Sequence, residues 1–178
     1  LDVRIAVNVS PVALLDGDFA ARVLEIIERG PGSGEWLELE VTESTLMEEP
    51  ELMLVRLAPL MQRGVRLAID DFGTGYSSLS MLRRFKAHTL KIDRSLVLDM
   101  AGDADNALIV QTIIGLAHSL GMTVVAEGAA SGELCDRLAA LGCDEIQGFA
   151  IGAPMAAPQA TAWLRAVAPS SFAPMDAA

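Results

Sequence analysis

Residues 69–78 read Ile69-Asp70-Asp71-Phe72-Gly73-Thr74-Gly75-Tyr76-Ser77-Ser78, so two adjacent carboxylates follow an apolar run and a glycine-rich loop comes directly after them. Adjacent side chains of a strand point to opposite faces, and the two carboxylates therefore share one environment only if the strand ends at Asp70 and the chain turns. Oxygen ligands suit Mg²⁺ and Ca²⁺, and two such cations held close together can clamp a phosphoryl group. The alternative interpretation is a solvated turn with a helix cap at Ser77 or Ser78.

The same arrangement recurs along the chain. Apolar, β-branched runs cover residues 3–9, 36–42, 65–70, 89–93, 122–127 and 144–148 and predict six strands. Each run finishes in side chains that bind ions or phosphates. These side chains are Asn8, Glu40, Glu43, Asp70, Asp71, Lys91, Asp93, Glu127 and Gln147.

Segments with helical apolar spacing separate the runs. They predict helices over residues 11–29, 49–62, 103–120, 131–141 and about 157–167, and a shorter helix after the glycine-rich loop. Repeated strand-then-helix units predict parallel strands joined by right-handed crossovers. The fold class is therefore α/β.

Two parallel architectures fit this order, an open sheet and a closed barrel. In an open sheet only the strands beside the switch point bring their carboxyl ends to a shared site, whereas in a barrel every strand does. Because all six runs end in ion-binding side chains, we expect a TIM-type (β/α)8 barrel of which this chain carries the last six β/α units. Such a barrel has eight strands, so we expect two strands before Leu1 and a longer parent protein.

Composition limits the function classes. The chain has 178 residues, of which 52% are hydrophobic, which is enough for one domain over residues 1–168; residues 169–178 are expected to be a disordered tail. A net charge of −11 and the lack of a Lys/Arg-rich block argue against duplex nucleic acid as a partner. Polar residues interrupt the most apolar segment, 107–126, so we expect no membrane contact. The expected location of this domain is the cytoplasm, with Cys135 and Cys143 as reduced thiols.

At this point the residues resemble a known family. Asn8, the block from Glu40 to Glu43, residues 70–78, the block from Leu90 to Asp93 and the motifs at Glu127-Gly128 and Gln147-Gly148-Phe149 occur in the order and rough spacing of the EAL domain, a bacterial phosphodiesterase family that cleaves cyclic di-GMP. The similarity extends from Val7 to about Leu164. No single motif would suffice, but together they are specific.

The resemblance implies a role for each of these residues. Ligands of one Mg²⁺ or Mn²⁺ would be Asn8, Glu40, Asp70 and Glu127, and Asp71 would serve a second metal. Lys91 would contact the nucleophilic water and the phosphate, Asp93 would position Lys91, and Gln147 would form a hydrogen bond at the metal site. Substrate contacts would come from Asp71, Lys91, Gln147 and Pro154. Glu43 would pin the loop 72–78 near a homodimer interface.

The implied chemistry agrees with the charge of the site. A carboxylate-rich pocket repels the dianionic cyclic di-GMP unless cations reverse the local charge. The metals would acidify a water, polarise the phosphoryl oxygen and stabilise the leaving 3′ oxygen, which gives linear pGpG. The resemblance therefore implies metal-dependent phosphodiester hydrolysis.

Some positions depart from the family pattern. The Glu-Ala-Leu tripeptide that names the family, and a metal-ligand glutamate with it, does not occur in these 178 residues. Ala130 stands where a second glutamate is common, and residues 151–154 replace a frequent Phe-Ser-Arg-Pro near the nucleotide. Two further functions therefore stay open beside the phosphodiesterase: a cyclic di-GMP receptor without turnover, and a scaffold that acts through a dimer surface only.

Overall fold

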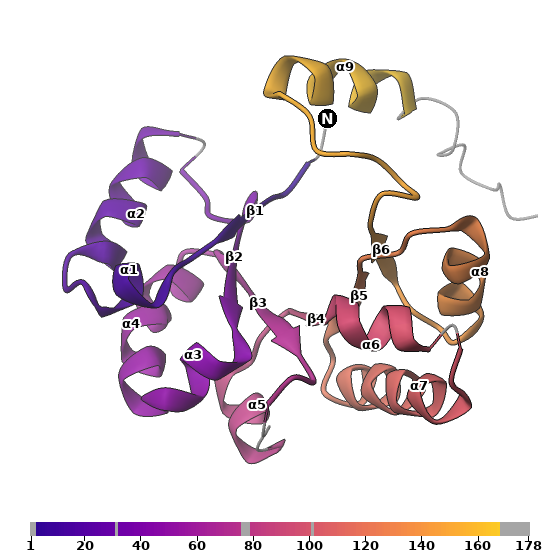
Figure 1. The fold of residues 1–178 in the computed structure, drawn as a ribbon. Coiled ribbons are helices and arrows are strands. Elements are labelled where there is room, and N and C mark those ends of the chain that lie inside the picture. Colours follow the sequence, from indigo (N-terminus) through magenta and orange to yellow (C-terminus); the bar gives the residue numbers. More distant parts are fainter. Residues whose placement is uncertain (1–2, 31, 76–78, 101, 168–178) are drawn as a thin grey trace, which may run out of the picture.

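A computed structural model describes residues 3–30, 32–75, 79–100 and 102–167. Its centre is a sheet of six parallel strands in sequential order: β1 (Ile5–Asn8), β2 (Leu37–Thr42), β3 (Arg66–Phe72), β4 (Thr89–Ile92), β5 (Thr123–Glu127) and β6 (Glu145–Gln147). The sheet curves into a partial barrel (Figure 1). All six predicted strands and their parallel order are confirmed.

Helices surround the outside of the curved sheet (Figure 1). They are α1 (Pro11–Leu15), α2 (Phe19–Arg29), α3 (Glu43–Glu48), α4 (Pro50–Gln62), α5 (Leu79–Phe85), α6 (Arg94–Asp99), α7 (Ala104–Ser119), α8 (Gly132–Ala140) and α9 (Ala157–Val167). Helix α9 follows β6 and lies above the side on which β1 and β6 face each other. The predicted tail at 169–178 lies outside the described residues.

The prediction of one helix over residues 11–29 is wrong. The chain forms α1 and α2 with a break at residues 16–18. The carboxylate of Asp16 accepts a hydrogen bond from the backbone N–H of Asp18 at 3.0 Å, and the Asp16 carbonyl accepts one from Arg56 at 2.7 Å. Aspartate side chains compete in this way with helical hydrogen bonds, and they end helices.

Two short helices were not predicted from the sequence. Helix α3 starts directly after β2 with Thr42 as its cap, and α6 starts directly after β4 with Asp93 as its cap. Six residues are too few to display a helical period, so only the capping residues indicated these turns. Both helices begin at the carboxyl ends of strands and therefore shape the rim of the barrel.

The strands have two unlike faces. The face toward the helices carries the apolar core, with Leu37, Leu39, Val41, Leu67, Ile69, Leu90, Ile92, Val124 and Ala126 all buried. The opposite, concave face carries buried polar side chains, among them Glu38, Glu40, Asp70, Thr89 and Lys91. Because successive residues alternate between faces, one sequence pattern supplies both the core and a polar interior.

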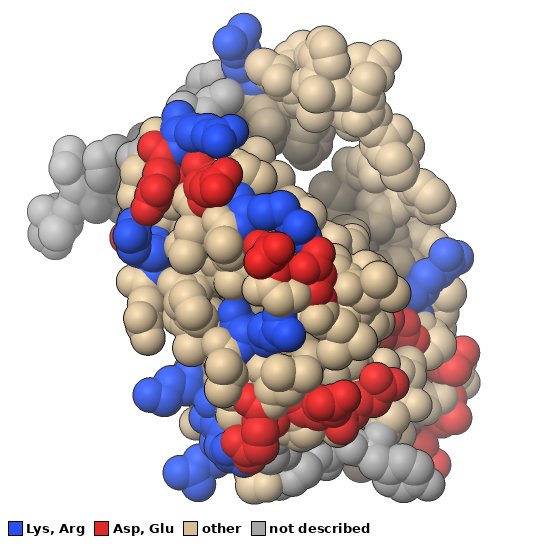
Figure 2. Space-filling view, turned by 90° about the vertical axis from the view of Figure 1, so that its left-hand side faces the viewer, with Lys and Arg blue, Asp and Glu red and all other residues tan. Residues whose placement is uncertain are grey.

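Several charges on the outer surface occur in pairs. On the face that carries α1, α2 and α4, blue and red side chains lie beside each other (Figure 2), and exposed ion pairs join Arg22 to Asp16 and Arg63 to Glu28. The described residues of this face therefore form no extended basic patch. Within the described residues no helix has both the length and the apolar character required to cross a bilayer.

Candidate metal centre

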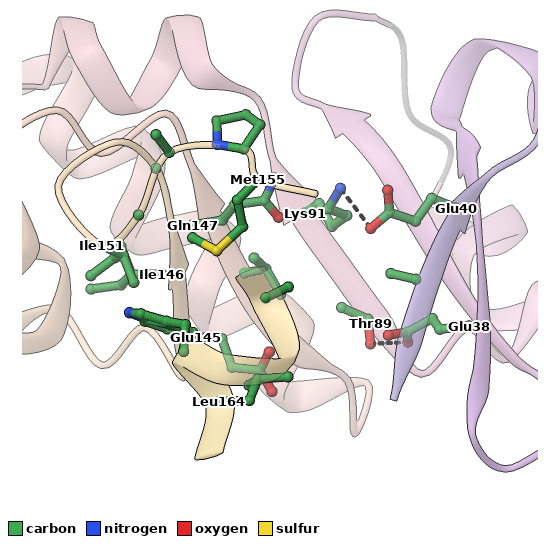
Figure 3. A pocket seen from close by; sticks show the side chains of 18 residues that line it. Glu38, Glu40, Thr89, Lys91, Glu145, Ile146, Gln147, Ile151, Met155 and Leu164 are labelled. Atoms are coloured by element: carbon green, nitrogen blue, oxygen red, sulfur yellow. Dashed lines mark hydrogen bonds and ion pairs between the residues drawn. The ribbon is translucent and has the colours of Figure 1, made fainter. Parts of the chain in front are cut away.

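Lys91 lies at the centre of the polar interior. Its ammonium nitrogen is 2.5 Å from Glu127 Oε1, 2.8 Å from Glu40 Oε1 and 3.2 Å from Asp70 Oδ1. The lysine comes from β4, and the three carboxylates come from β5, β2 and β3. Figure 3 shows the pair with Glu40 at the edge of the cavity. Four strands thus bring one cation and three anions together at their carboxyl ends.

Lys91 is 4% exposed, and it keeps its charge. Burial by itself lowers the pKa of the amine, but the hydrogen bonds to Glu127 and Glu40 and the charge of Asp70 outweigh it and raise the pKa of Lys91 well above its usual range. The ammonium is therefore the form that meets the carboxylates.

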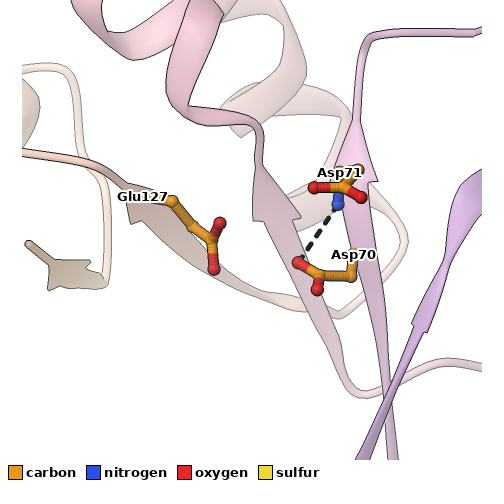
Figure 4. Close-up of side chains that lie close together, drawn as sticks. All are labelled: Asp70, Asp71 and Glu127. Carbon is orange, nitrogen blue, oxygen red and sulfur yellow. Dashed lines mark hydrogen bonds between the residues drawn. The ribbon is translucent and has the colours of Figure 1, made fainter. Parts of the chain in front are cut away.

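Asp70 and Asp71 are brought to one side by an irregularity of β3. Asp71 has a φ of 55°, in the left-handed region, and the register between β3 and β4 shifts between Ile69 and Phe72. The Asp71 backbone N–H donates a hydrogen bond to Asp70 Oδ1 at 3.1 Å (Figure 4). The expectation that the strand ends at Asp70 is wrong, because β3 continues to Phe72 and a bulge at Asp71 replaces the turn.

The bulge completes a group of carboxylates that fits a cation. One oxygen each from Asp70, Asp71 and Glu127 lies within 4.8 Å of the others (Figure 4). Burial, together with the charges of Asp70 and Asp93, raises the pKa of the Asp71 carboxyl. Hard divalent cations take several carboxylate oxygens as ligands, so the donor set suits Mg²⁺, Mn²⁺ or Ca²⁺.

Asn8 and Gln147 stand at the two ends of the same rim. In the strand register Asn8 lies opposite Glu40, and Gln147 lies opposite Glu127. Both side chains are exposed. The register therefore brings both predicted residues to the edge that holds Lys91 and its carboxylates.

The family of the chain can now be stated from comparison with known proteins. The model of the EAL domain matches residues 1–154. The chain belongs to the EAL domain family. The resemblance inferred from the motifs is therefore confirmed.

Relatives of known description support this assignment. MucR of Pseudomonas aeruginosa, a bifunctional diguanylate cyclase/cyclic di-GMP phosphodiesterase, is 42% identical over 158 residues, which are 89% of this chain and 23% of MucR. The solved MucR phosphodiesterase in complex with c-di-GMP has a TM-score of 0.84 and 42% identity, over 88% of this chain and 64% of that structure. A manganese/cyclic di-GMP complex of Klebsiella pneumoniae BlrP1 has a TM-score of 0.76 and 32% identity, over 83% of this chain and 38% of BlrP1. This chain thus spans less than a quarter of MucR.

Glu43, a predicted EAL site residue, lies outside the carboxylate group. It is 3% exposed in the first turn of α3, and its Oε2 accepts a hydrogen bond from the backbone N–H of Gly73 at 3.2 Å. This contact holds Gly73, the second residue of the loop 72–78 that Glu43 was predicted to pin. Residues 76–78 of that loop lie outside the described residues, so the full role stays a prediction.

Asp93 makes a different contact from the one expected. Its carboxylate accepts hydrogen bonds from the backbone N–H of Ser95, at 2.9 Å, and from the Ser95 hydroxyl, and so caps α6. Among the described residues, the ion-pair partners of Lys91 are Glu40, Asp70 and Glu127. Direct positioning of Lys91 by Asp93 therefore gains no support from these contacts.

A cavity of about 570 Å³ opens beside the carboxylate group. Its lining includes Glu40, Lys91, Gln147 and Pro154, so three predicted substrate-binding residues share it with a predicted metal ligand (Figure 3). Asp71, the fourth predicted substrate contact, belongs to the neighbouring carboxylate group. A cavity lined by a predicted metal ligand and by predicted substrate contacts can hold a ligand against the cation site.

Sequence reasoning missed a second polar layer deeper in the barrel. The Thr89 hydroxyl donates a hydrogen bond to Glu38 Oε1 at 2.5 Å, and Arg66 Nε lies 3.6 Å from the same oxygen. The signal was present, because Glu38 and Thr89 precede Glu40 and Lys91 by two residues and so share their face. Glu38 and Thr89 line the same cavity as Glu40 and Lys91.

Proposed function

We propose that the protein containing this chain is a metal-dependent phosphodiesterase that hydrolyses cyclic di-GMP to pGpG. The observation that carries the proposal is the meeting of Lys91 with Glu40, Asp70 and Glu127 at the carboxyl ends of four neighbouring strands. Similar chains of MucR and BlrP1 hold c-di-GMP in their solved structures, which supports this substrate.

The proposed metal ligands are Asn8, Glu40, Asp70, Asp71 and Glu127. Mg²⁺ or Mn²⁺ in a site for two cations suits this donor set of carboxylate and amide oxygens. When bound, such cations supply positive charge to the phosphoryl group and lower the pKa of a water molecule. The carboxylates of this chain hold those cations from three different strands, which fixes their place relative to the cavity.

The remaining residues bind and orient the substrate. Lys91 presents its ammonium at the cavity wall, where it stabilises phosphoryl charge and holds a water by hydrogen bonding. Gln147 and Pro154 line the same cavity and restrict where the nucleotide lies. Glu43 supports this arrangement through the loop that begins at Gly73, and Asp93 adds negative charge near Asp71.

Homodimerisation, and a cytoplasmic location for this domain, complete the proposal. Relatives of this chain are named cyclic di-GMP phosphodiesterases, and a dimer surface near the loop after β3 would place the Glu43 contact next to the partner. Sedimentation of the purified protein tests the dimer.

The decisive experiment is turnover with matched variants. Purified protein that includes this chain is incubated with cyclic di-GMP and Mg²⁺ or Mn²⁺, and the products are separated by chromatography. We expect pGpG from the wild type and from Asp136→Asn, a change at an exposed position of α8, and none from Asp70→Asn or after chelation. Binding of cyclic di-GMP without product would favour the receptor function instead, and the absence of both would favour the scaffold.

A further inference from the structure

The carboxylates proposed to bind metal already have a cation between them. The Lys91 ammonium contacts Glu127, Glu40 and Asp70 at 2.5, 2.8 and 3.2 Å. All three are proposed metal ligands, so the lysine and a divalent cation draw on the same three carboxylates.

The distances place a cation that shares one of these oxygens close to the ammonium. Mg²⁺ binds carboxylate oxygens at about 2.1 Å. A cation that shares Glu127 Oε1 with Lys91 therefore lies within about 5 Å of the ammonium. Like charges at that distance in a buried site repel strongly, because little water screens them.

The charge of the group explains why an ammonium is needed when metal is absent. Glu40, Asp70, Asp71 and Glu127 bring four carboxylates to one rim, and each of those that contact Lys91 is at least four-fifths buried. Buried anions without a partner are costly. Lys91 is the one cation that contacts three of them among the described residues.

The cavity gives Lys91 a place to move. The lysine lines the 570 Å³ cavity together with Gln147 and Pro154, on the side where a substrate phosphate is proposed to bind. Its four-carbon stem has the length and rotational freedom to turn the ammonium from the carboxylates toward that space.

We propose that Lys91 is a built-in counter-cation that holds the metal ligands together in the metal-free protein and swings into the cavity when divalent cations bind. Metal occupancy then makes the ammonium available to the substrate phosphate, so the lysine couples the two binding events. This inference rests on the proposed function, since it requires the metal centre.

The chain provides its own control for a direct test, because its only lysines are Lys86 and Lys91. The wild-type protein is treated briefly with an amine-acylating reagent, with and without saturating Mn²⁺, and the ratio of acylation at Lys91 to that at exposed Lys86 is measured by mass spectrometry. We expect Mn²⁺ to raise this ratio several-fold. Calorimetry on the same sample reports whether Mn²⁺ binds.

The outcomes separate this inference from the proposed function. An unchanged or lower ratio with Mn²⁺ bound would overturn the counter-cation and leave the metal centre intact. No Mn²⁺ binding at all would overturn both.

A pair of lysine variants tests whether Lys91 competes with the metal, with Mn²⁺ affinity as the measured quantity. Lys91→Met removes the competing cation while keeping most of the side-chain length, and Lys86→Met makes the same change at an exposed site. We expect Lys91→Met to bind Mn²⁺ several-fold more tightly than the wild type and to gain more in Tm from Mn²⁺, with Lys86→Met unchanged. Equal or weaker Mn²⁺ affinity in Lys91→Met would refute the competition, and the labelling experiment decides if this variant does not fold.

Discussion

Glu43 and Gly73 are 30 residues apart in the chain, yet Glu43 Oε2 accepts the Gly73 backbone N–H at 3.2 Å and joins α3 to the end of β3. The carboxylate is buried, while Gly73 faces solvent. The contact therefore anchors the start of an exposed loop to a fixed point on the rim of the barrel.

Removal of the Glu43 carboxylate should increase the mobility of the loop after β3 more than it lowers the stability of the whole domain. We expect Glu43→Ala to lose about 1–2 kcal/mol of unfolding free energy, because a charged hydrogen-bond acceptor is removed. Glu43→Gln keeps an acceptor and should lose less. Urea unfolding and amide exchange at Gly73 measure both effects. The exposed Glu48→Ala on the same helix is the control, and equal exchange at Gly73 in all variants would contradict the anchoring role.

Two substitutions at Asp71, whose backbone is left-handed, should distinguish an effect on stability from an effect on metal affinity. Asn tolerates a φ of 55°, so Asp71→Asn should leave stability near that of the wild type while metal affinity falls. Asp71→Val should be destabilised by about 1–2 kcal/mol, since a β-branched residue resists this conformation. Thermal unfolding combined with calorimetric metal titration distinguishes the two changes. If Asp71→Val proved as stable as Asp71→Asn, the bulge would not persist in solution.

His88 should make stability depend on pH. Burial lowers the pKa of His88, and the charge of Arg66 lowers it further, while Nδ1 accepts the Leu67 backbone N–H at 3.3 Å. A histidine whose pKa falls on folding contributes stability that is complete above about pH 6.5 and is lost as the pH drops through the folded pKa.

The measurement compares the wild type with His88→Gln. Urea unfolding at pH 7.5 and pH 5.5 should show a larger loss of unfolding free energy in the wild type, because glutamine does not titrate. His118→Gln controls for the second histidine, which is exposed and pairs with Asp144. A pH dependence that is identical in the wild type and His88→Gln would show that the imidazole is equally accessible to protons in both states.

Two glycines after β6 should differ in their tolerance of a substitution to alanine. A Cβ added to Gly148 would collide with the backbone of Ala129, whereas one added to Gly152 meets nothing within 4 Å. We expect Gly148→Ala to cost about 1–3 kcal/mol, because backbone must shift, and Gly152→Ala to be neutral. Because Gly148 follows Gln147, substrate affinity should fall with the first variant only. Chemical unfolding and ligand titration test this, and a neutral Gly148→Ala would disprove the close approach.

Much of the fold followed from the order of residues. Runs that end in Asn8, Glu40, Asp70, Lys91 and Glu127 predicted parallel strands whose carboxyl ends meet, and the register confirms that order. Helix α7 was predicted to within one residue at each end, since sixteen residues display a clear helical period. The break at Asp16 and the bulge at Asp71 escaped prediction, because a single side chain causes the first and one backbone angle the second.

The sequence by itself determined which residues face the interior, because alternation along a strand is a local property of the chain. It also determined that carboxylates and one lysine end neighbouring strands. Only the tertiary structure decided that Lys91 lies between Glu127, Glu40 and Asp70, and that Asp71 joins the group through a bulge. The physical reason is that distances between strands depend on register and sheet curvature, which arise when the whole core packs.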